Sequence, residues 1–360
     1  MKCTDKILFL AEYPNERNIA DGMIQRIKAI DEQFEACPRV YLSVLSRRRF
    51  FKSSKTRVND RLEIIHANLF TGIFLIMKTV LSSKNVYIHS LYNYKWVFPF
   101  ISKRKCVVLD LHGVVPQELD FMGRKFQARI FSWLEKRIFG ILSGAIFVSD
   151  RMKDYYIDRY SISEDKKLII LPIIPRNALI KVGRGEEDEL RKRLSISARD
   201  VVFIYSGNLQ KWQNFELMLD KINELNNPGY KFIILTGDVG GAEALIEKKG
   251  LDRTKITLTR VLPSEIGEYY SISHYGFILR DDHILNEVAA PTKLVEYMFY
   301  GLVPIVKSVK LGDAPAYGFE YIDIESLNDS MTAIKSDKNR MVAARIIKRG
   351  DGVDLKDMFV

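Results

Sequence analysis

The segment from Ala290 to Val306 combines residue types that suit the binding of a nucleotide. Pro291 fits the first position of a helix, where its missing N–H costs nothing, and Gly301 fits the position just past a helix end. The predicted helix, residues 292–300, carries free N–H groups and partial positive charge at its N-terminus, and it feeds directly into a strand. We therefore expect a phosphate group to bind at the start of this helix.

Charged side chains in the first turns of this helix could contact other parts of the same ligand. Glu296 lies on the same face as Thr292 and Lys293, at spacings of four and three residues. Lys293 adds a full positive charge, and a carboxylate can accept two hydrogen bonds from a ribose diol. This layout suits a nucleotide, with phosphate at the helix end and the ribose hydroxyls one turn further in. An ordinary capped helix with Glu296 exposed to solvent explains the same residues without a ligand.

Other strand ends carry cations and glycines that could contact a diphosphate. Gly207 follows a strand in the stretch Ser206–Asn214, where it lets the backbone approach a ligand, and Lys211 is the nearest cation. Arg280 ends another predicted strand. Lys211, Arg280 and Lys293 are therefore candidates to bind phosphate, the alternative being that Lys211 is simply solvated.

Three weaker candidates also lie next to strands or helix starts. Thr236 and Gly237 follow a predicted strand and are expected near a nucleotide base, although a plain turn explains this pair equally well. Gly22 opens a helix that could meet the diphosphate from the other domain. A helix N-cap at Asp21 accounts for the same residues without a ligand.

A histidine follows the apolar run from Val107 to Leu111. An imidazole at the carboxyl end of a strand is well placed to hydrogen-bond a sugar hydroxyl. We therefore expect His112, followed by Gly113, on the side of the acceptor. The alternative is a histidine that merely packs at a strand end.

The elements that must position these residues alternate between strand and helix, which favours a parallel sheet covered on both faces. In the front half we predict strands at 6–11, 39–44, 63–66, 86–89, 106–111, 144–148 and 167–174, with helices at 21–33, 73–81 and 123–142. In the back half we predict strands at 201–205, 231–235, 256–258, 276–279 and 303–306, with helices at 184–193, 214–226, 241–249, 263–271 and 292–300.

The predicted fold class is therefore α/β, with two Rossmann-like, doubly wound domains that face each other across a cleft. We place the acceptor-side domain at 1–174 and the nucleotide-sugar domain at 175–360, with the last helix able to pack back on the first domain. Ligands are expected at the carboxyl ends of the strands, in the cleft. No Walker loop, G-x-S-x-G or G-x-G-x-x-G occurs.

The segment Ala290–Val306 resembles the donor motif of retaining GT-B glycosyltransferases, particularly the family-four-like enzymes of bacterial capsule, O-antigen and exopolysaccharide assembly. Their Pro-Thr-Lys, Glu-Tyr, Gly and Pro positions match, and Gly276–Asp282 is similar to their preceding strand and its Leu-Arg ending. The resemblance implies the GT-B fold. It also implies transfer of a sugar, with retention, from a UDP or GDP sugar to a saccharide or polyprenyl-diphosphate-linked acceptor. It implies no bound metal or other cofactor.

The resemblance also assigns residues, with departures. That family has two glutamates eight positions apart, but Val288 stands eight before Glu296, and Glu287 stands nine before it. The expected arginine and lysine of the phosphate loop are Asn208 and Gln213. The residues implied for the donor are Gly22, Gly207, Asn208, Gln213, Thr236, Gly237, Asn286, Glu287, Pro291, Thr292, Lys293 and Glu296. Because of these departures we expect Lys211 and Arg280, with Lys293, to neutralise the leaving diphosphate, so the catalytic candidates are His112, Lys211 and Arg280, and the acceptor candidates are His112 and Glu118.

Positive charge is concentrated in the front half. The net charge is +10, and residues 1–175 hold 29 Lys and Arg against 18 Asp and Glu, whereas the remainder holds 26 against 27. The densest run contains Arg47, Arg48, Arg49 and Lys52, with aromatic residues between them. Such a run can attract anionic lipid, with nucleic acid as a minor option and a solvated loop as the plain alternative. We expect an anionic membrane surface as partner and no nucleic acid.

We expect a cytoplasmic protein that is peripheral on the inner face of the cell membrane. The apolar stretch Leu69–Leu81 contains Lys78 and is shorter than the roughly 20 residues that span a bilayer. The apolar run Ile7–Leu10 is too short for a signal peptide core. Three cysteines without metal-ligand spacing fit reduced thiols. The neighbouring Asp281, Asp282 and His283 are too few for an expected metal site.

Two other functions fit the same residues. A sugar-nucleotide 2-epimerase shares the fold and the nucleotide ligand, but it needs acid and base carboxylates in the cleft. A non-catalytic subunit that binds a nucleotide sugar or an anionic polymer is compatible with the departures at Asn208, Gln213 and Val288.

Overall fold

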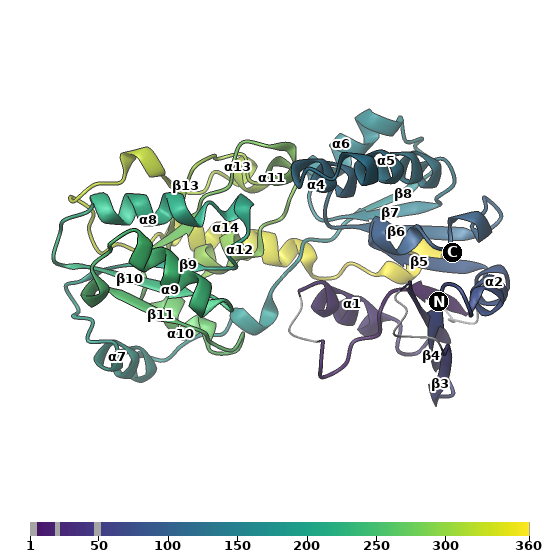
Figure 1. Ribbon diagram of the computed structural model, residues 1–360, viewed down its shortest axis with the longest axis horizontal. Helices are drawn as coiled ribbons and strands as arrows, with labels where there is room; N and C mark the ends of the chain where they lie inside the picture. The colour runs from purple at the N-terminus through teal and green to yellow at the C-terminus, as the bar shows by residue number, and fades with distance from the viewer. Residues whose placement is uncertain (1–5, 19–21, 47–51, 360) are drawn as a thin grey trace. The chain divides into compact units, whose positions relative to one another are not determined.

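The computed structural model describes residues 6–18, 22–46 and 52–359 (Figure 1). The chain forms two compact units, which consist of residues 1–171 with 352–360 and of residues 172–351. The chain therefore leaves the first unit after Leu171 rather than after residue 174. Residues 352–360, which we predicted in the second domain, belong to the first unit.

The first unit is built on an eight-stranded sheet in the order β3-β4-β2-β1-β5-β6-β7-β8, in which only β3 is antiparallel to its neighbour. Every residue of Ile7–Leu10 and of Asn85–His89 is buried, as expected for central strands that are covered on both faces. The strands are β1 (Ile7–Leu10), β2 (Arg39–Leu45), β3 (Ser54–Asn59), β4 (Leu62–Asn68), β5 (Asn85–His89), β6 (Cys106–Leu111), β7 (Gly144–Phe147) and β8 (Lys167–Ile170).

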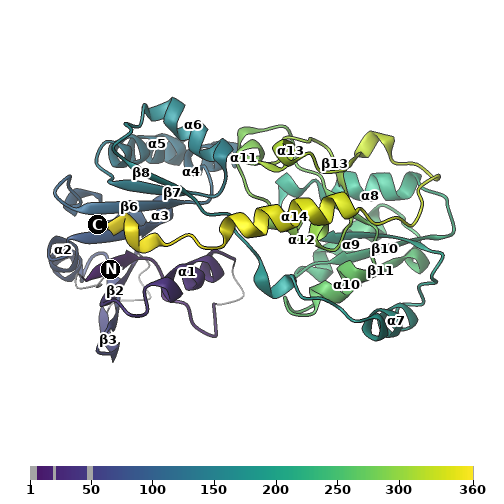
Figure 2. The ribbon, with the colours of Figure 1, turned by 180° about the vertical axis from the view of Figure 1, so that it is seen from behind.

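Helices cover both faces of this sheet. Helix α1 lies on one face together with the C-terminal turn η6, and α4, α5 and α6 lie on the other face (Figures 1 and 2). The helices are α1 (Gly22–Gln33), α2 (Ile73–Leu81), α3 (Ser90–Tyr94), η1 (Phe98–Phe100), α4 (Val115–Phe121), α5 (Lys125–Phe139), α6 (Asp150–Tyr160) and η6 (Leu355–Phe359).

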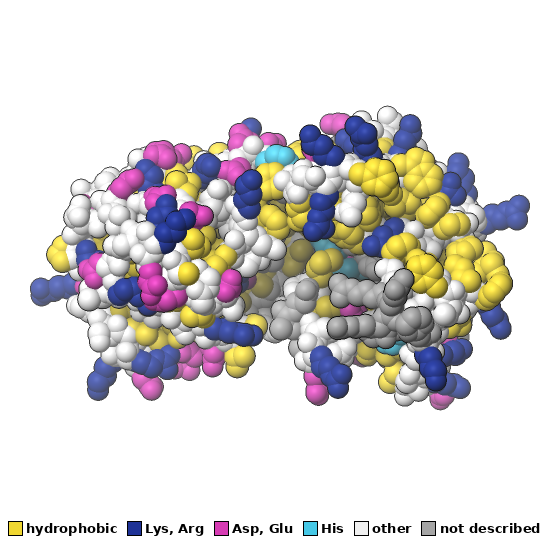
Figure 3. Space-filling model, viewed as in Figure 1, with side chains coloured by type: hydrophobic (Ala, Val, Ile, Leu, Met, Phe, Trp, Pro, Cys, Tyr) yellow, Lys and Arg dark blue, Asp and Glu magenta, His cyan; other side chains and the backbone are white. Residues whose placement is uncertain are grey.

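Aromatic rings fill the core beneath α1. Phe9 stacks on Tyr41 with centroids 4.9 Å apart and meets Tyr87 at 5.0 Å. Phe359 of η6 packs edge-on against Phe34 at 5.7 Å, so the C-terminal turn completes this core. Exposed hydrophobic side chains also gather on the surface over α2 and α5 (Figure 3).

The second unit contains a six-stranded sheet in the order β11-β10-β9-β12-β13-β14, and all of its strand pairs are parallel. The strands are β9 (Val201–Ser206), β10 (Tyr230–Leu235), β11 (Ile256–Thr259), β12 (Tyr275–Ile278), β13 (Val303–Val306) and β14 (Ile322–Asp323).

Two apolar clusters flank this sheet. Helices α8 and α9 contribute to one cluster, while α7, α10, α12 and α14 contribute to the other. The helices are η2 (Arg176–Ala178), α7 (Arg184–Arg193), η3 (Lys211–Gln213), α8 (Phe215–Glu224), α9 (Val239–Lys248), η4 (Arg253–Lys255), α10 (Ile266–Ile272), α11 (Ile284–Glu287), α12 (Thr292–Phe299), α13 (Ala314–Tyr317), η5 (Ile324–Ser326) and α14 (Asp337–Gly350). Helix α14 packs on α12, so only the turn η6 returns to the first unit.

Some predictions of local structure were wrong. The helix expected over 123–142 is α5, but the preceding helix α4 was not predicted; Gly123, with a left-handed φ of +75°, separates the two. The basic run continues into an unforeseen strand, β3. Cys106 has a free thiol, but Cys37 takes part in a disulfide, which removes the argument from cysteines for a cytoplasmic location. Among the described residues, every helix is too short or too polar to cross a membrane.

Candidate functional site

Helix α12 begins and ends much as its sequence predicts. Pro291 is the N-cap and not the first helical residue, because its ψ of 109° is not helical. At the other end Gly301 adopts a φ of +72°. The N–H of Leu302 bonds the carbonyl of Tyr297 at 2.9 Å, and the N–H of Gly301 bonds that of Met298 at 2.9 Å, which together form a Schellman motif.

Glu296 is buried with 2% of its surface exposed, so the alternative of a solvated carboxylate was wrong. Its Oε2 accepts hydrogen bonds from the Tyr270 hydroxyl at 2.7 Å and from Lys293 Nζ at 2.8 Å. Burial and the adjacent carboxylate raise the pKa of Tyr270 well above its usual range, so the phenol stays a donor. Both bonds end on Oε2, which leaves Oε1 as the acceptor that a ligand can use.

Tyr297 joins this helix to the end of strand β9. The N–H of Ser206 donates to the Tyr297 hydroxyl at 3.1 Å, and both groups are buried. Gly276 on β12 makes room for the same ring, because a Cβ there would lie 2.3 Å from Tyr297 Cδ2. These contacts fix the start of the loop that follows β9 relative to α12.

The loop after β9 turns back toward the end of β12. Asn214 adopts a left-handed φ of 51°, and its amide donates to the Leu279 carbonyl at 2.6 Å and to Asp281 at 3.1 Å. The Tyr205 hydroxyl donates to the carbonyl of Asn208. The loop thereby brings Gly207 and the exposed Lys211 to the strand end that also carries Arg280, as the sequence predicts for neighbouring parallel strands.

Arg280 is the cation of this strand end that burial affects most. Burial lowers the pKa of its guanidinium, and the Tyr205 ring lies nearby. Arg280 makes no hydrogen bond or ion pair with any residue that the structure describes. By contrast, Lys293 is paired with Glu296, and Lys307 with Asp281 at 2.5 Å. An unpaired, desolvated guanidinium is expected to attract an anionic group.

The remaining donor candidates occupy loops of the second unit. Thr236 is buried, its Oγ1 accepts from the N–H of Asp238 at 3.3 Å, and Gly237 beside it is exposed. Asn286 is also buried, and its amide donates to the Asp281 carbonyl at 2.8 Å, which closes the loop after β12. Glu287 lies 3.8 Å from Lys310. Asn208 and Gln213 lie on the β9 loop, where the Asn208 side chain accepts from the N–H of Gln210.

In the first unit, Asp110 is the centre of a buried network at the ends of β5 and β6. Arg26 of α1 binds both of its oxygens, at 2.7 and 2.8 Å, and the Tyr87 hydroxyl donates to Oδ2 at 2.7 Å. His89 Nδ1 lies 3.3 Å from the same oxygen. Burial alone would raise the pKa of Asp110, but the guanidinium holds it well below its usual range.

His112 stacks on His89, with ring centroids 4.5 Å apart. Burial lowers the pKa of His112 to about 3, so the ring is neutral at physiological pH. Neither ring nitrogen of His112 has a hydrogen-bond partner among the described residues, and the same holds for His89 Nε2. Buried polar atoms without partners indicate a place where a ligand donates or accepts hydrogen bonds.

The group of His89, Asp110 and His112 has the residue types and the spacing of a metal site, with one ligand atom from each residue within 4.8 Å of the others. The Asp110 carboxylate, however, is already bound by Arg26 through both oxygens. A guanidinium at that position repels a cation and occupies the lone pairs that a metal would need. The network therefore fits a hydrogen-bonding ligand better than a metal ion.

Glu118 and Gly22 are the other candidates of the first unit. Glu118 in α4 is mostly buried, which raises its pKa, and its carboxylate lies against Gly113. A Cβ at Gly113 would lie 2.0 Å from Glu118 Oε1, so glycine is required for this approach. Gly22 is the first described residue of α1 and is exposed, whereas the proposed N-cap Asp21 lies outside the described residues.

We expect the neutral state of His112 to make folding sensitive to acid. Its folded-state pKa is about 3 against 6.5 in the unfolded chain, so in this window the unfolded state binds a proton that the folded state does not. The free energy of unfolding should therefore fall as pH drops from 6.5 toward 3. Urea denaturation at pH 7 and pH 5 should show a smaller loss for His112→Asn than for the unsubstituted chain. The exposed His66, replaced in the same way, serves as control, and equal pH dependence in all three chains would contradict the expectation.

Comparison with known proteins yields matches in structure only. Neither the protein-family models nor the curated proteins contain a match. Among solved structures, Anabaena Alr3699/HepE in complex with UDP and glucose has 14% identity and a TM-score of 0.58, over 99% of this chain and 91% of that one. Sucrose-phosphate synthase from Thermosynechococcus elongatus has 12% identity and a TM-score of 0.61, over 99% and 95%. WaaG, a glycosyltransferase involved in lipopolysaccharide biosynthesis, has 11% identity and a TM-score of 0.61, over 98% and 97%.

The chain has the GT-B fold. Its two units correspond to the two Rossmann-like domains of that fold, so the predicted fold class is confirmed. The similarity covers nearly the full length of the chain in each comparison.

The GT-B units contain buried polar residues that motif reading missed. Tyr270 holds Glu296, and Arg26, Tyr87 and His89 surround Asp110. A sequence signal existed for His89, which ends a strand just as His112 follows the next one. No comparable signal marks Tyr270 or Arg26, because each reaches its partner from another element.

Proposed function

We propose that this chain is a glycosyltransferase that moves a sugar from a nucleotide diphosphate sugar to a hydroxyl of a saccharide or lipid-linked acceptor. The observation that carries the proposal is the group at the strand ends of the second unit. There a half-buried Arg280 with no partner among the described residues, the exposed Lys211 and the N-terminus of α12 are available to bind a diphosphate. A UDP sugar is favoured over a GDP sugar because Alr3699/HepE, a similar structure, holds UDP and UDP-glucose.

The positive charges stabilise the departing diphosphate. As the bond between the sugar C1 and the phosphate oxygen breaks, negative charge builds on the diphosphate, and preorganised cations in a desolvated site lower that barrier. Arg280 is placed to carry most of this task, because Lys293 already shares its charge with Glu296. Lys211 and the free N–H groups of α12 add to it.

Glu296 orients the donor. Its Oε1 accepts from the ribose hydroxyls while Tyr270 and Lys293 hold Oε2, so the carboxylate cannot rotate away. Thr236 and Gly237 lie at the end of β10 and are proposed to border the base. Asn286 supports the loop after β12, which carries Glu287 on the donor side.

The acceptor hydroxyl is proposed to bind at His112 and Glu118. A neutral imidazole with free nitrogens can accept or donate a hydrogen bond to a sugar hydroxyl. The acceptor oxygen then bonds to C1 on the face that the diphosphate leaves, and its proton passes to a leaving phosphate oxygen. Configuration at C1 is thereby retained.

The proposed biological role is bacterial surface polysaccharide synthesis at the inner face of the cell membrane, with a polyprenyl-diphosphate-linked saccharide as one acceptor class. WaaG, similar in structure, is a glycosyltransferase involved in lipopolysaccharide biosynthesis. Residues 47–51 of the basic run lie outside the described residues, and Lys52 is exposed.

The test combines the purified chain, UDP and GDP sugars and a polyprenyl-diphosphate-linked saccharide. We expect a product whose anomeric configuration, read by NMR, matches that of the donor. Excess EDTA should leave the rate unchanged, because protein cations supply the charge that a divalent metal would otherwise supply. Inversion at C1 or loss of activity in EDTA would contradict the mechanism. Turnover without acceptor would indicate an epimerase, and binding without turnover a non-catalytic subunit.

A further inference from the structure

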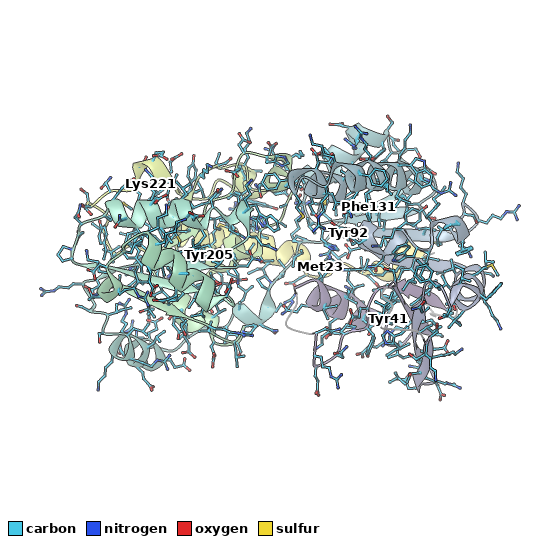
Figure 4. The ribbon with its side chains drawn as sticks, viewed as in Figure 1. Met23, Tyr41, Tyr92, Phe131, Tyr205 and Lys221 are labelled. Atoms are coloured by element: carbon cyan, nitrogen blue, oxygen red, sulfur yellow. The ribbon has the colours of Figure 1, made fainter. Side chains whose placement is uncertain are left out.

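Helix α5 of the first unit has two apolar faces. On one face Ala128, Phe131, Leu134 and Ile138 are buried within the first unit. Tyr92 of α3 and Phe131 point toward each other between the two helices, with ring centroids 5.2 Å apart (Figure 4). The opposite face carries Phe126, Ile130 and Trp133, whose spacing of four and three residues aligns them along one stripe, with 77%, 42% and 52% exposed. Among the described residues, this second apolar face therefore stays exposed to solvent.

The exposed charged side chains of α5 are all basic. Lys125, Arg129, Lys136 and Arg137 are exposed, and the single acidic side chain of α5, Glu135, is buried. Glu135 accepts from the hydroxyls of Tyr156 and Tyr160 and so adds no negative charge to the surface stripe. None of the four cations forms an ion pair within the part of the chain that the structure describes.

The apolar stripe continues through η1 to α2. Phe98 of η1 packs edge-on against Trp133 with centroids 5.3 Å apart, and Arg137 lies over both rings at 5.7 and 6.0 Å. Helix α2 in turn contacts η1. It exposes Phe74 and Leu81, and Phe70 is exposed just before it. Figure 3 shows hydrophobic and basic side chains intermixed over this part of the unit.

Residues 64–109, which include α2 and η1, contain six Lys and Arg and no Asp or Glu. Residues 121–149, which include α5, contain five Lys and Arg and only the buried Glu135 as an acid. The described part of the N-terminal basic run differs, because Lys55 pairs with Glu63 and Arg57 with Asp60, both at 2.8 Å. Uncompensated positive charge therefore coincides with the exposed aromatic rings and not with strand β3.

We infer that the surface of Phe70, Phe74, Leu81, Phe126, Ile130 and Trp133, hereafter the α2–α5 face, docks on an anionic lipid bilayer. An interfacial helix of this kind places aromatic and aliphatic side chains below the headgroups while its Lys and Arg contact lipid phosphates. Aromatic rings favour that boundary because it is apolar on one side and wet on the other. The α2–α5 face would thus be the part of the chain that contacts the membrane. Only the biological setting, the inner face of the cell membrane, rests on the proposed function.

The test measures binding of the full chain to phosphatidylcholine vesicles with and without phosphatidylglycerol by co-sedimentation. We expect binding to the anionic vesicles, and a fall in the partition coefficient of at least about tenfold in the triple variant Phe126→Ser, Ile130→Ser, Trp133→Ser, since each substitution removes an apolar side chain that the bilayer would bury. All three side chains are exposed, so the fold should tolerate the change. Raising salt to about 1 M, where the Debye length is about 3 Å, should weaken binding of the unsubstituted chain.

The matched control is Leu262→Ser with Ile334→Ser, which removes exposed apolar side chains from the second unit and should leave vesicle binding unchanged. Equal partitioning of the triple variant, or absence of binding to anionic vesicles, would overturn the inference. It would also fail if sedimentation showed a dimer that the triple variant dissociates while vesicle binding stays the same. The assay contains no nucleotide, so Glu296→Gln should bind vesicles normally, and failure of the donor site is distinguishable from failure of the α2–α5 face.

Discussion

Replacing Glu296 by Gln should raise the dissociation constant for the nucleotide sugar about 10- to 100-fold. The neutral amide keeps the shape of the side chain and can still accept from Tyr270, but it loses the charge-assisted bonds to Lys293 and to the ribose. Hydrogen bonds to charged groups contribute about 1.5–3 kcal/mol, which corresponds to the stated range. Isothermal titration with UDP and with a UDP sugar measures the effect directly.

The control is Glu325→Gln in the same unit. Glu325 is exposed and also pairs with a lysine, Lys221, at 2.8 Å, so it tests the loss of a similar ion pair away from the ligand. We expect unchanged nucleotide affinity in that variant. Equal affinity of Glu296→Gln and the unsubstituted chain would show that the buried carboxylate only stabilises helix α12.

Arg280→Met should have opposite effects on stability and on activity. The Arg280 guanidinium is half-buried and desolvated and has no partner among the described residues, which is costly, so its removal should leave the melting temperature of the ligand-free chain unchanged or raise it. The same change should remove most of the stabilisation that UDP confers and lower kcat/KM by about 10²- to 10³-fold, as is typical when one preorganised donor is lost. Thermal denaturation with and without UDP and initial-rate kinetics provide the two measurements.

This pair of effects separates a binding role from a structural one. A residue that merely supports the loop after β12 would lower the melting temperature and the activity together. The control is Arg260→Met near the end of β11, where the replaced cation is exposed to solvent. This variant should change neither the melting temperature nor the activity. Retention of the full UDP-dependent stabilisation by Arg280→Met would mean that the diphosphate binds elsewhere.

The sequence predicted most of the fold because apolar runs and turn residues agree along the chain. Helix α7 matches its predicted bounds, and α2 does as well. The errors have local physical causes. Helix α4 was missed because it is short and ends at Gly123, whose left-handed φ separates it from α5, and β3 forms from a polar, fully exposed segment that owes its structure to pairing with β4.

The sequence could predict the candidate site only where the interacting residues belong to the same helix or strand. Lys293 and Glu296 belong to a single helix, so their spacing of three residues is enough to place them side by side. The burial of Glu296 depends on Tyr270 in another helix, and the unpaired state of Arg280 depends on the surrounding loops. Pairing of this kind is set by tertiary packing and leaves no periodicity in the sequence.

The turn η6 lies at the C-terminal end of the chain, so the first unit can be completed only after the second unit has been synthesised. Leu355 and Met358 are buried in the core of the first unit, the N–H of Leu355 bonds the Gln33 side chain at 3.0 Å, and Lys167 bonds the Asp357 carbonyl at 2.7 Å. A ribosome delivers residues 172–351 before these groups arrive. The second unit can therefore finish folding while the first still exposes the apolar surface around Phe34, although the first unit begins earlier in the sequence.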